Sequence, residues 1–144
     1  MLNQFLTENV IKVQQHVNSW QEAIQLGGAL LLKTEAIEEN YIQAMIDAVH
    51  KHGPYIAIAP GIAIAHAAPG KFVNDDAISL VTLKEAVAIG HDTNDPIHLF
   101  FVVAAKSNEG HLTFLQELVT ILSDDKSLGI LKTGNKEAVL ALFQ

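Results

Sequence analysis

Two histidines lie in surroundings where an imidazole could carry a phosphoryl group. His66 ends the small-residue apolar run PGIAIAHA, and His111 begins the amphipathic run HLTFLQELVTIL. A neutral imidazole is a nucleophile, and the first turn of a helix has unpaired backbone N–H groups that attract anions. This pairing predicts a phosphohistidine on His66, with His111 and the N–H groups around residues 110–113 receiving the phosphoryl oxygens.

Both histidines also have ordinary structural interpretations. His66 could be a loop histidine whose ring is satisfied by backbone hydrogen bonds, and spacing alone favours neither interpretation. His111 could be a polar residue in the first turn of a helix. The chemical interpretation requires the two rings to meet in space, with His66 open to an incoming partner.

A histidine-ligated metalloenzyme is a less favoured alternative. The chain has seven histidines, and His50 and His52 would join His66 and His111 in such a site. Residues two apart on a helix do not face each other, and zinc needs three or four converging ligands. There is no H-E-x-x-H motif. We therefore expect no metal ligands and no cofactor.

Composition narrows the class of protein. All nine basic residues are lysine and the net charge is −7, so the phosphate contacts that nucleic-acid binding needs are scarce and no nucleic-acid partner is expected. Cysteine is absent, which excludes disulfides and thiolate metal sites. No apolar run is long enough to span a bilayer, and the N-terminus lacks the pattern of a signal peptide. We expect a soluble cytoplasmic protein with a single domain over residues 1–144.

The order of elements predicts how the two histidines are positioned. Alternating or continuous apolar segments predict strands, whereas the 3.6-residue period and capping residues predict helices. The expected strands are 10–17, 55–59, 62–66, 77–84, 87–89 and 97–105. The expected helices are 20–33, 38–51, 111–122, 124–131 and 136–143. This order favours an α/β fold: a three-layer sandwich with a mixed sheet flanked by helices on both faces.

Several motifs in this order resemble the enzyme IIA components of the bacterial sugar phosphotransferase system, in the mannitol/fructose structural class. They are GPYIAIAPGIAIAHA, SLVTL, NDPI before a hydrophobic strand, and HLTFLQELVTIL. The first two most resemble the ascorbate-type branch. The resemblance implies the same sandwich fold, phosphorylation of His66 by HPr, and transfer to a cysteine of enzyme IIB. It also implies that His111 is the second active-site histidine, and that the membrane enzyme IIC is an indirect partner.

The sequence departs from this family at two places. Many relatives have Pro before and Gly after the active histidine, where this chain has Ala65 and Ala67. Many also carry an Arg-Glu pair upstream, where this chain reads Lys51-His52. The resemblance implies transport of ascorbate or a related sugar or pentitol, but not which one, and a homodimer is compatible with it. A phosphorylation-sensing regulatory domain of the same fold is the alternative.

Overall fold

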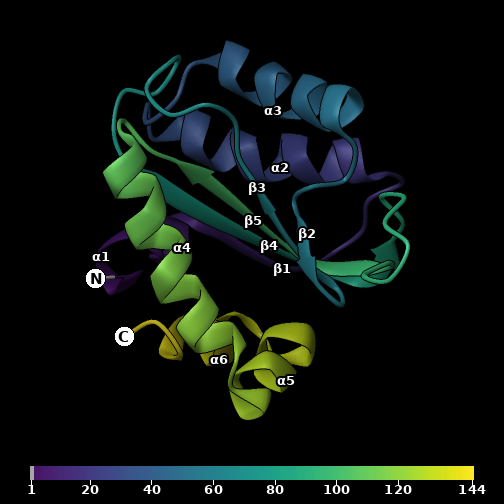
Figure 1. The fold of residues 1–144 in the computed structure, drawn as a ribbon. Coiled ribbons are helices and arrows are strands. Elements are labelled where there is room, and N and C mark those ends of the chain that lie inside the picture. The colour runs from purple at the N-terminus through teal and green to yellow at the C-terminus, as the bar shows by residue number, and fades with distance from the viewer. Residues whose placement is uncertain (1) are drawn as a thin grey trace.

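The computed structural model describes residues 2–144 and arranges five strands in one mixed sheet (Figure 1). The strand order across the sheet is β1-β4-β5-β3-β2. β1 is parallel to β4 and β3 is parallel to β5, whereas the β4–β5 and β2–β3 pairs are antiparallel. The bounds are β1 (Ile11–Gln15), β2 (Ala57–Ala59), β3 (Ile62–Ala65), β4 (Ala77–Val87) and β5 (Ile97–Ala104).

Helices cover both faces of this sheet, which confirms the predicted three-layer sandwich (Figure 1). The helices α2 and α3 lie on one face, with α2 directly against β4 and β5. The helices α4, α5 and α6 lie on the other face. The bounds are α1 (Leu2–Phe5), η1 (Glu8–Val10), α2 (Trp20–Lys33), α3 (Glu39–His52), α4 (Asn108–Leu122), α5 (Asp125–Thr133) and α6 (Lys136–Ala141). None of the helices in residues 2–144 combines the length and apolar character that crossing a bilayer requires.

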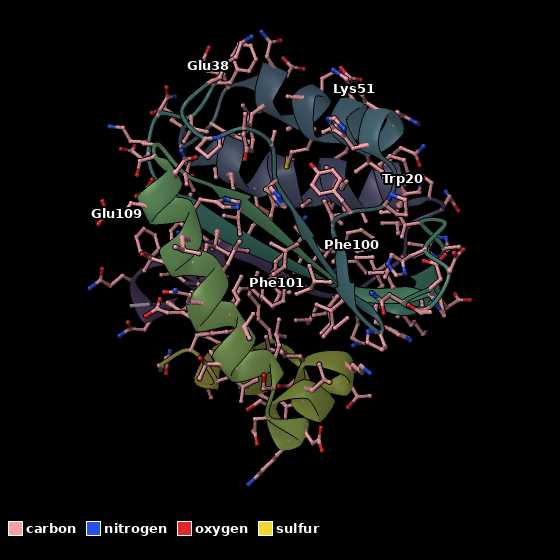
Figure 2. The ribbon with its side chains drawn as sticks, in the orientation of Figure 1. Trp20, Glu38, Lys51, Phe100, Phe101 and Glu109 are labelled. Atoms are coloured by element: carbon pink, nitrogen blue, oxygen red, sulfur yellow. The ribbon has the colours of Figure 1, made fainter. Side chains whose placement is uncertain are left out.

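The centre of the sheet is buried on both faces, as the apolar run in β5 predicted. Phe100 and Phe101 are adjacent, so their side chains point to opposite faces (Figure 2), and both are fully buried. Phe101 lies opposite Leu80 of β4 and Ile64 of β3. These three strands therefore form a rigid base from which β3 presents the residue that follows it.

The helix α2 begins at Trp20 and ends at Lys33, as the sequence indicated. The Ser19 hydroxyl accepts a hydrogen bond from the Glu22 N–H at 3.2 Å, which caps the helix. A Cβ atom added at Gly27 would lie 2.7 Å from Val102 Cγ2, and one at Gly28 would lie 2.6 Å from a side-chain carbon of Ile42. Two glycines thus bring α2 close to both β5 and α3.

The structure differs from the expected elements at several places. Residues 77–84 and 87–89 were expected to form two strands, but β4 runs unbroken to Val87, which pairs with Ile97. Lys84 and Glu85 are exposed and interrupt the apolar pattern. The pairing of β4 with β5 shifts register between Thr82 and Val87, but the strand itself continues. The strand expected over 55–59 begins only at Ala57, because the chain still turns through the two preceding residues. The short helix α1 was not expected.

Candidate active site

The two candidate histidines line one open groove between α3 and the start of α4. Figure 2 shows Lys51 on α3 and Glu109 at the start of α4. The groove has a volume of about 670 Å³. α3 contributes the residues Ala44, Asp47, Ala48, Lys51 and His52; the segments after α3 and β3 contribute Tyr55, His66, Ala67, Ala68 and Pro69; and α4 contributes Asn108 and His111.

His66 follows directly after β3 and is half-buried. Its Nδ1 lies 2.8 Å from the Ile64 carbonyl oxygen. A carbonyl only accepts hydrogen bonds, so Nδ1 carries the proton and the neutral ring keeps its lone pair on Nε2. Within residues 2–144 no group hydrogen-bonds Nε2, and this atom is not buried. The tautomer therefore leaves a nucleophilic nitrogen accessible.

His111 meets His66 across the groove. The ring centroids are 4.8 Å apart and the ring planes are inclined by 57°. The sequence alone could not establish this contact, because the two residues come from a strand end and from a helix on the opposite face. A group bound to the ring of His66 would lie beside the ring of His111.

Both imidazoles are held neutral near pH 7. Burial lowers the pKa of His66, against the opposing effect of its hydrogen bond to Ile64. Burial also lowers the pKa of His111, and the nearby charge of a protonated His66 lowers it further. A neutral ring is the nucleophilic form, and a neutral His111 retains one N–H to donate.

The helix that carries His111 begins earlier than expected. Ser107 caps α4, so His111 is its fourth residue rather than its first. The Gly110 N–H donates to the Ser107 hydroxyl, and the His111 N–H donates to the Ser107 carbonyl. The prediction that these two N–H groups receive phosphoryl oxygens is therefore wrong, because both are already hydrogen-bonded. The N–H groups that α-helix geometry leaves free are those of Asn108 and Glu109.

A carboxylate already lies at this helix end. Asp76 Oδ1 accepts a hydrogen bond from the Lys106 N–H at 2.7 Å, and a Cβ atom added at Gly110 would lie 3.2 Å from Asp76 Oδ2. The partial positive charge of the first turn of α4 is thus partly compensated within the protein.

Two tyrosines belong to the site, although the sequence did not indicate them. The Tyr55 ring packs edge-on against the ring of His66, with centroids 5.2 Å apart, and its hydroxyl donates to the His66 carbonyl. The Tyr41 hydroxyl accepts a hydrogen bond from the Ala67 N–H. The motif GPYIAIAPGIAIAHA includes Tyr55, but neither contact follows from local sequence spacing.

The four histidines of the metal alternative do not converge on one point, although His66 and His111 meet. The His50 ring packs against Trp20, whereas the His52 ring faces Tyr55 with centroids 6.3 Å apart. Among the described residues, no group of three or more His, Cys, Asp or Glu side chains is placed to hold a metal ion. Lys51 and His52, which stand where many relatives were noted to carry Arg-Glu, both line the groove.

The α/β sandwich brings two imidazoles together beside the end of a strand, in an open groove. The chain belongs to the family described as phosphoenolpyruvate-dependent sugar phosphotransferase system, EIIA 2, whose sequence model matches residues 4–144. It is therefore an EIIA component of the mannitol/fructose class, a phosphoryl carrier in a sugar phosphotransferase chain.

Known relatives are similar to this chain in sequence and in structure over nearly its whole length. The ascorbate-specific PTS system EIIA component of Escherichia coli (strain K12) is 35% identical over 138 residues, which covers 94% of this chain and 90% of that protein. The structure of the mannitol-specific cryptic phosphotransferase enzyme IIA CmtB from Escherichia coli superposes with a TM-score of 0.88 at 32% identity, over 99% of this chain and 97% of that one.

A further similar structure contains a partner. It is the complex of enzyme IIA(Mtl) and phosphorylated enzyme IIB(Mtl) from Escherichia coli, with a TM-score of 0.83 at 25% identity, over 96% of this chain and 97% of that one. The fold of this chain thus occurs in a phosphoryl-transfer complex between two proteins.

Proposed function

We propose that His66 accepts a phosphoryl group from phospho-HPr and passes it to a cysteine of enzyme IIB. One observation carries this assignment: Nδ1 is held by the Ile64 carbonyl, which leaves the unprotonated Nε2 accessible in the groove. A bond forms between Nε2 and phosphorus while the bond from phosphorus to the donor breaks, and its electron pair returns to the donor. The cysteine thiolate then attacks phosphorus, and the Nε2–phosphorus bond breaks with its electron pair returning to Nε2, which regenerates the neutral imidazole.

His111 stabilises the phosphoryl group in this proposal. Its ring lies 4.8 Å from that of His66, within reach of an oxygen on a phosphoryl group bound there. The transition state of phosphoryl transfer carries negative charge on its oxygens, so an oriented N–H donor favours it. Lys51 lines the same groove and supplies positive charge. A site without arginine holds the phosphoryl group less tightly, which suits a carrier that must release it.

Ascorbate or a related sugar or pentitol is the proposed transported substrate. The relatives named as ascorbate-specific, at 33% to 35% identity over most of the chain, support this part of the proposal. The carrier itself contacts proteins, so the choice of substrate would follow from the enzyme IIB that it recognises and, through it, from the membrane enzyme IIC. The proposal includes a cytoplasmic location and a single domain over residues 1–144.

Phosphorylation with purified components tests the role of His66. The protein is incubated with phosphoenolpyruvate, enzyme I and HPr, and intact mass and fragment spectra locate the added group. We expect one acid-labile phosphoryl group on His66 and none in His66→Ala. His16→Ala is the matched control, because His16 is an exposed histidine whose imidazole lies 3.9 Å from Glu85 at the other edge of the sheet. A phosphate on another residue, or full labelling of His66→Ala, would contradict the assignment.

Transfer to two types of enzyme IIB tests the substrate class. The phosphorylated protein is mixed with purified enzyme IIB from an ascorbate system or from a mannitol system. Faster loss of the phosphoryl group to the ascorbate-type protein is expected. Equal or faster transfer to the mannitol-type protein would overturn the ascorbate assignment and leave the carrier function intact.

A further inference from the structure

The peptide between His66 and Ala67 has both of its polar groups held by tyrosine hydroxyls. The Tyr55 hydroxyl donates to the His66 carbonyl at 2.8 Å, and the Ala67 N–H donates to the Tyr41 hydroxyl at 3.1 Å. The Tyr41 hydroxyl in turn donates to the Val103 carbonyl at 2.7 Å. The sequence contains two tyrosines, and both act on this one peptide.

The Tyr41 hydroxyl bridges β5 to the chain beyond the end of β3. The parallel pairing of β3 with β5 reaches Ala65, opposite Val102, and ends there. A direct backbone hydrogen bond would span about 2.9 Å. Instead, the Tyr41 hydroxyl oxygen lies between the two backbone groups. It is 3.1 Å from the Ala67 nitrogen and 2.7 Å from the Val103 carbonyl oxygen. The hydroxyl therefore holds the chain away from β5 at the point where it begins to line the groove.

Tyr55 restrains both the backbone and the ring of His66. Its hydroxyl fixes the His66 carbonyl, and its ring meets the imidazole edge-on, with the planes inclined by 87°. The Nδ1–H group reaches the Ile64 carbonyl only when the imidazole folds back over its own strand. The contacts that fix this orientation therefore also fix the tautomer that leaves Nε2 unprotonated.

Both hydroxyls keep their protons at neutral pH. Tyr41 is 1% exposed, and burial raises its pKa to about 12. Burial also raises the pKa of Tyr55. The two hydrogen bonds donated to the backbone carbonyls therefore persist throughout the range in which the imidazole is neutral.

We propose that Tyr41 and Tyr55 are positioning residues that fix the orientation and the tautomer of His66 for phosphoryl transfer. This inference rests on the proposed role of His66 as the phosphoryl acceptor. Neither hydroxyl bonds to the imidazole; both act through the peptide that follows it, and Tyr55 adds the edge contact of its ring. Without them, the imidazole remains in the groove but rotates away from the Ile64 carbonyl.

Replacement of each tyrosine by phenylalanine isolates the hydroxyl. Tyr55→Phe and Tyr41→Phe each remove one oxygen and keep the ring. Ser79→Ala is the matched control, because it removes a buried hydroxyl that donates to the Gly27 carbonyl at 2.8 Å beneath α2. Nitrogen-detected NMR of the imidazoles reports the tautomer directly. We expect the Nδ1–H form of His66 in the wild type and in Ser79→Ala, and a mixture of both tautomers in the two phenylalanine variants.

Phosphorylation kinetics give the second readout. Misorientation of a reacting group lowers the rate of the chemical step, so we expect kcat of Tyr55→Phe to fall about tenfold. The KM for phospho-HPr should stay within about twofold of the wild type, because the hydroxyl that is removed donates to the His66 carbonyl of the protein itself. If the loss of a hydroxyl lowered kcat only by destabilising the protein, kcat of Ser79→Ala would fall as well.

The outcomes separate this inference from the proposed function. The inference is overturned if both phenylalanine variants match Ser79→Ala in tautomer and in kcat. If Tyr41→Phe does not fold, Tyr55→Phe decides, since Tyr55 is 39% exposed and its loss leaves the core intact. A wild-type protein that accepts no phosphoryl group would overturn the proposed function, whereas the tautomer measurement would still decide whether the tyrosines orient His66.

Discussion

The imidazoles of His66 and His111 lie 4.8 Å apart, centroid to centroid, although His66 follows β3 and His111 lies on α4, in different layers of the sandwich. At this distance the protonation of one ring disfavours the protonation of the other. The pair therefore behaves as two neutral imidazoles, one anchored through Nδ1 to the Ile64 carbonyl and the other without a hydrogen bond to its ring in residues 2–144. Four predictions follow from this pair and from the packing that supports it.

His111→Ala should retain phosphorylation but transfer the phosphoryl group poorly. The nucleophile and its anchor remain, so HPr still labels the protein, whereas the donor beside the transferring group is lost. Removal of one such donor costs on the order of 100-fold or more in rate. Pulse labelling followed by a chase with enzyme IIB measures the two steps separately. Unchanged onward transfer would argue against a donor role for His111.

The pKa of His111 should rise when His66 is replaced by alanine. The variant removes the charge that lowers this pKa, while burial continues to lower it, so the new value should lie between that of the wild type and the ordinary value of 6.5. Phosphorylation of His66 should raise the pKa of His111 as well, because a phosphoryl group brings negative charge. Proton NMR titration of the imidazole measures all three states. An unchanged pKa in His66→Ala would show that the two rings do not interact electrostatically.

The free energy of unfolding should decrease as the pH falls below 6.5. The folded protein lowers the pKa of both His66 and His111, so the unfolded chain takes up protons first and is stabilised. The stability that this effect contributes is complete above 6.5 and is lost between 6.5 and the lower pKa of the folded state. Urea unfolding at about pH 8 and about pH 5.5 measures the change. His66→Ala should lose less stability over this range than the wild type, and an equal loss would contradict the assignment.

Gly27→Ala should destabilise the protein by about 1–3 kcal/mol, because the added methyl group would lie 2.7 Å from Val102 Cγ2 in a packed core. Gly129→Ala is the matched control. A Cβ atom at Gly129 has nothing within 4 Å, and alanine in an exposed helix favours folding by about 0.5–1 kcal/mol. Urea unfolding compares the two variants with the wild type. A Gly27→Ala protein as stable as the wild type would mean that α2 moves away from β5 at little cost.

Local chemistry explains which parts of the fold could be predicted. Ser19 marked the start of α2 because a capping hydroxyl and its N–H partner are three residues apart in sequence. The apolar run of β5 marked a central strand because both of its faces are buried. The start of α4 was missed because Ser107 caps it through Gly110, and a glycine followed by histidine resembled the end of a turn.

Long-range contacts explain what could not be predicted at the site. The Tyr41 hydroxyl joins Ala67, 26 positions away, to Val103, 62 positions away, and no sequence period encodes such a contact. The meeting of His66 and His111 likewise depends on β3 lying beside β5 and on α4 crossing the opposite face. The local surroundings in the sequence indicated the two histidines and the resemblance to a known family implied their roles, whereas only the structure shows what the two tyrosines contact.

β3 contains four residues, and side chains along a strand point alternately to its two sides. All four of these residues are buried, and His66 is the first residue beyond them, so its place in the groove depends on the number of residues that separate it from the turn at Gly61. Deletion of one residue within this stretch would direct the imidazole into the interior and leave an alanine methyl group in its place. The activity of the carrier thus depends on the number of residues between Gly61 and His66 as well as on the histidine. A change of chain length here would be as damaging as the loss of the histidine itself.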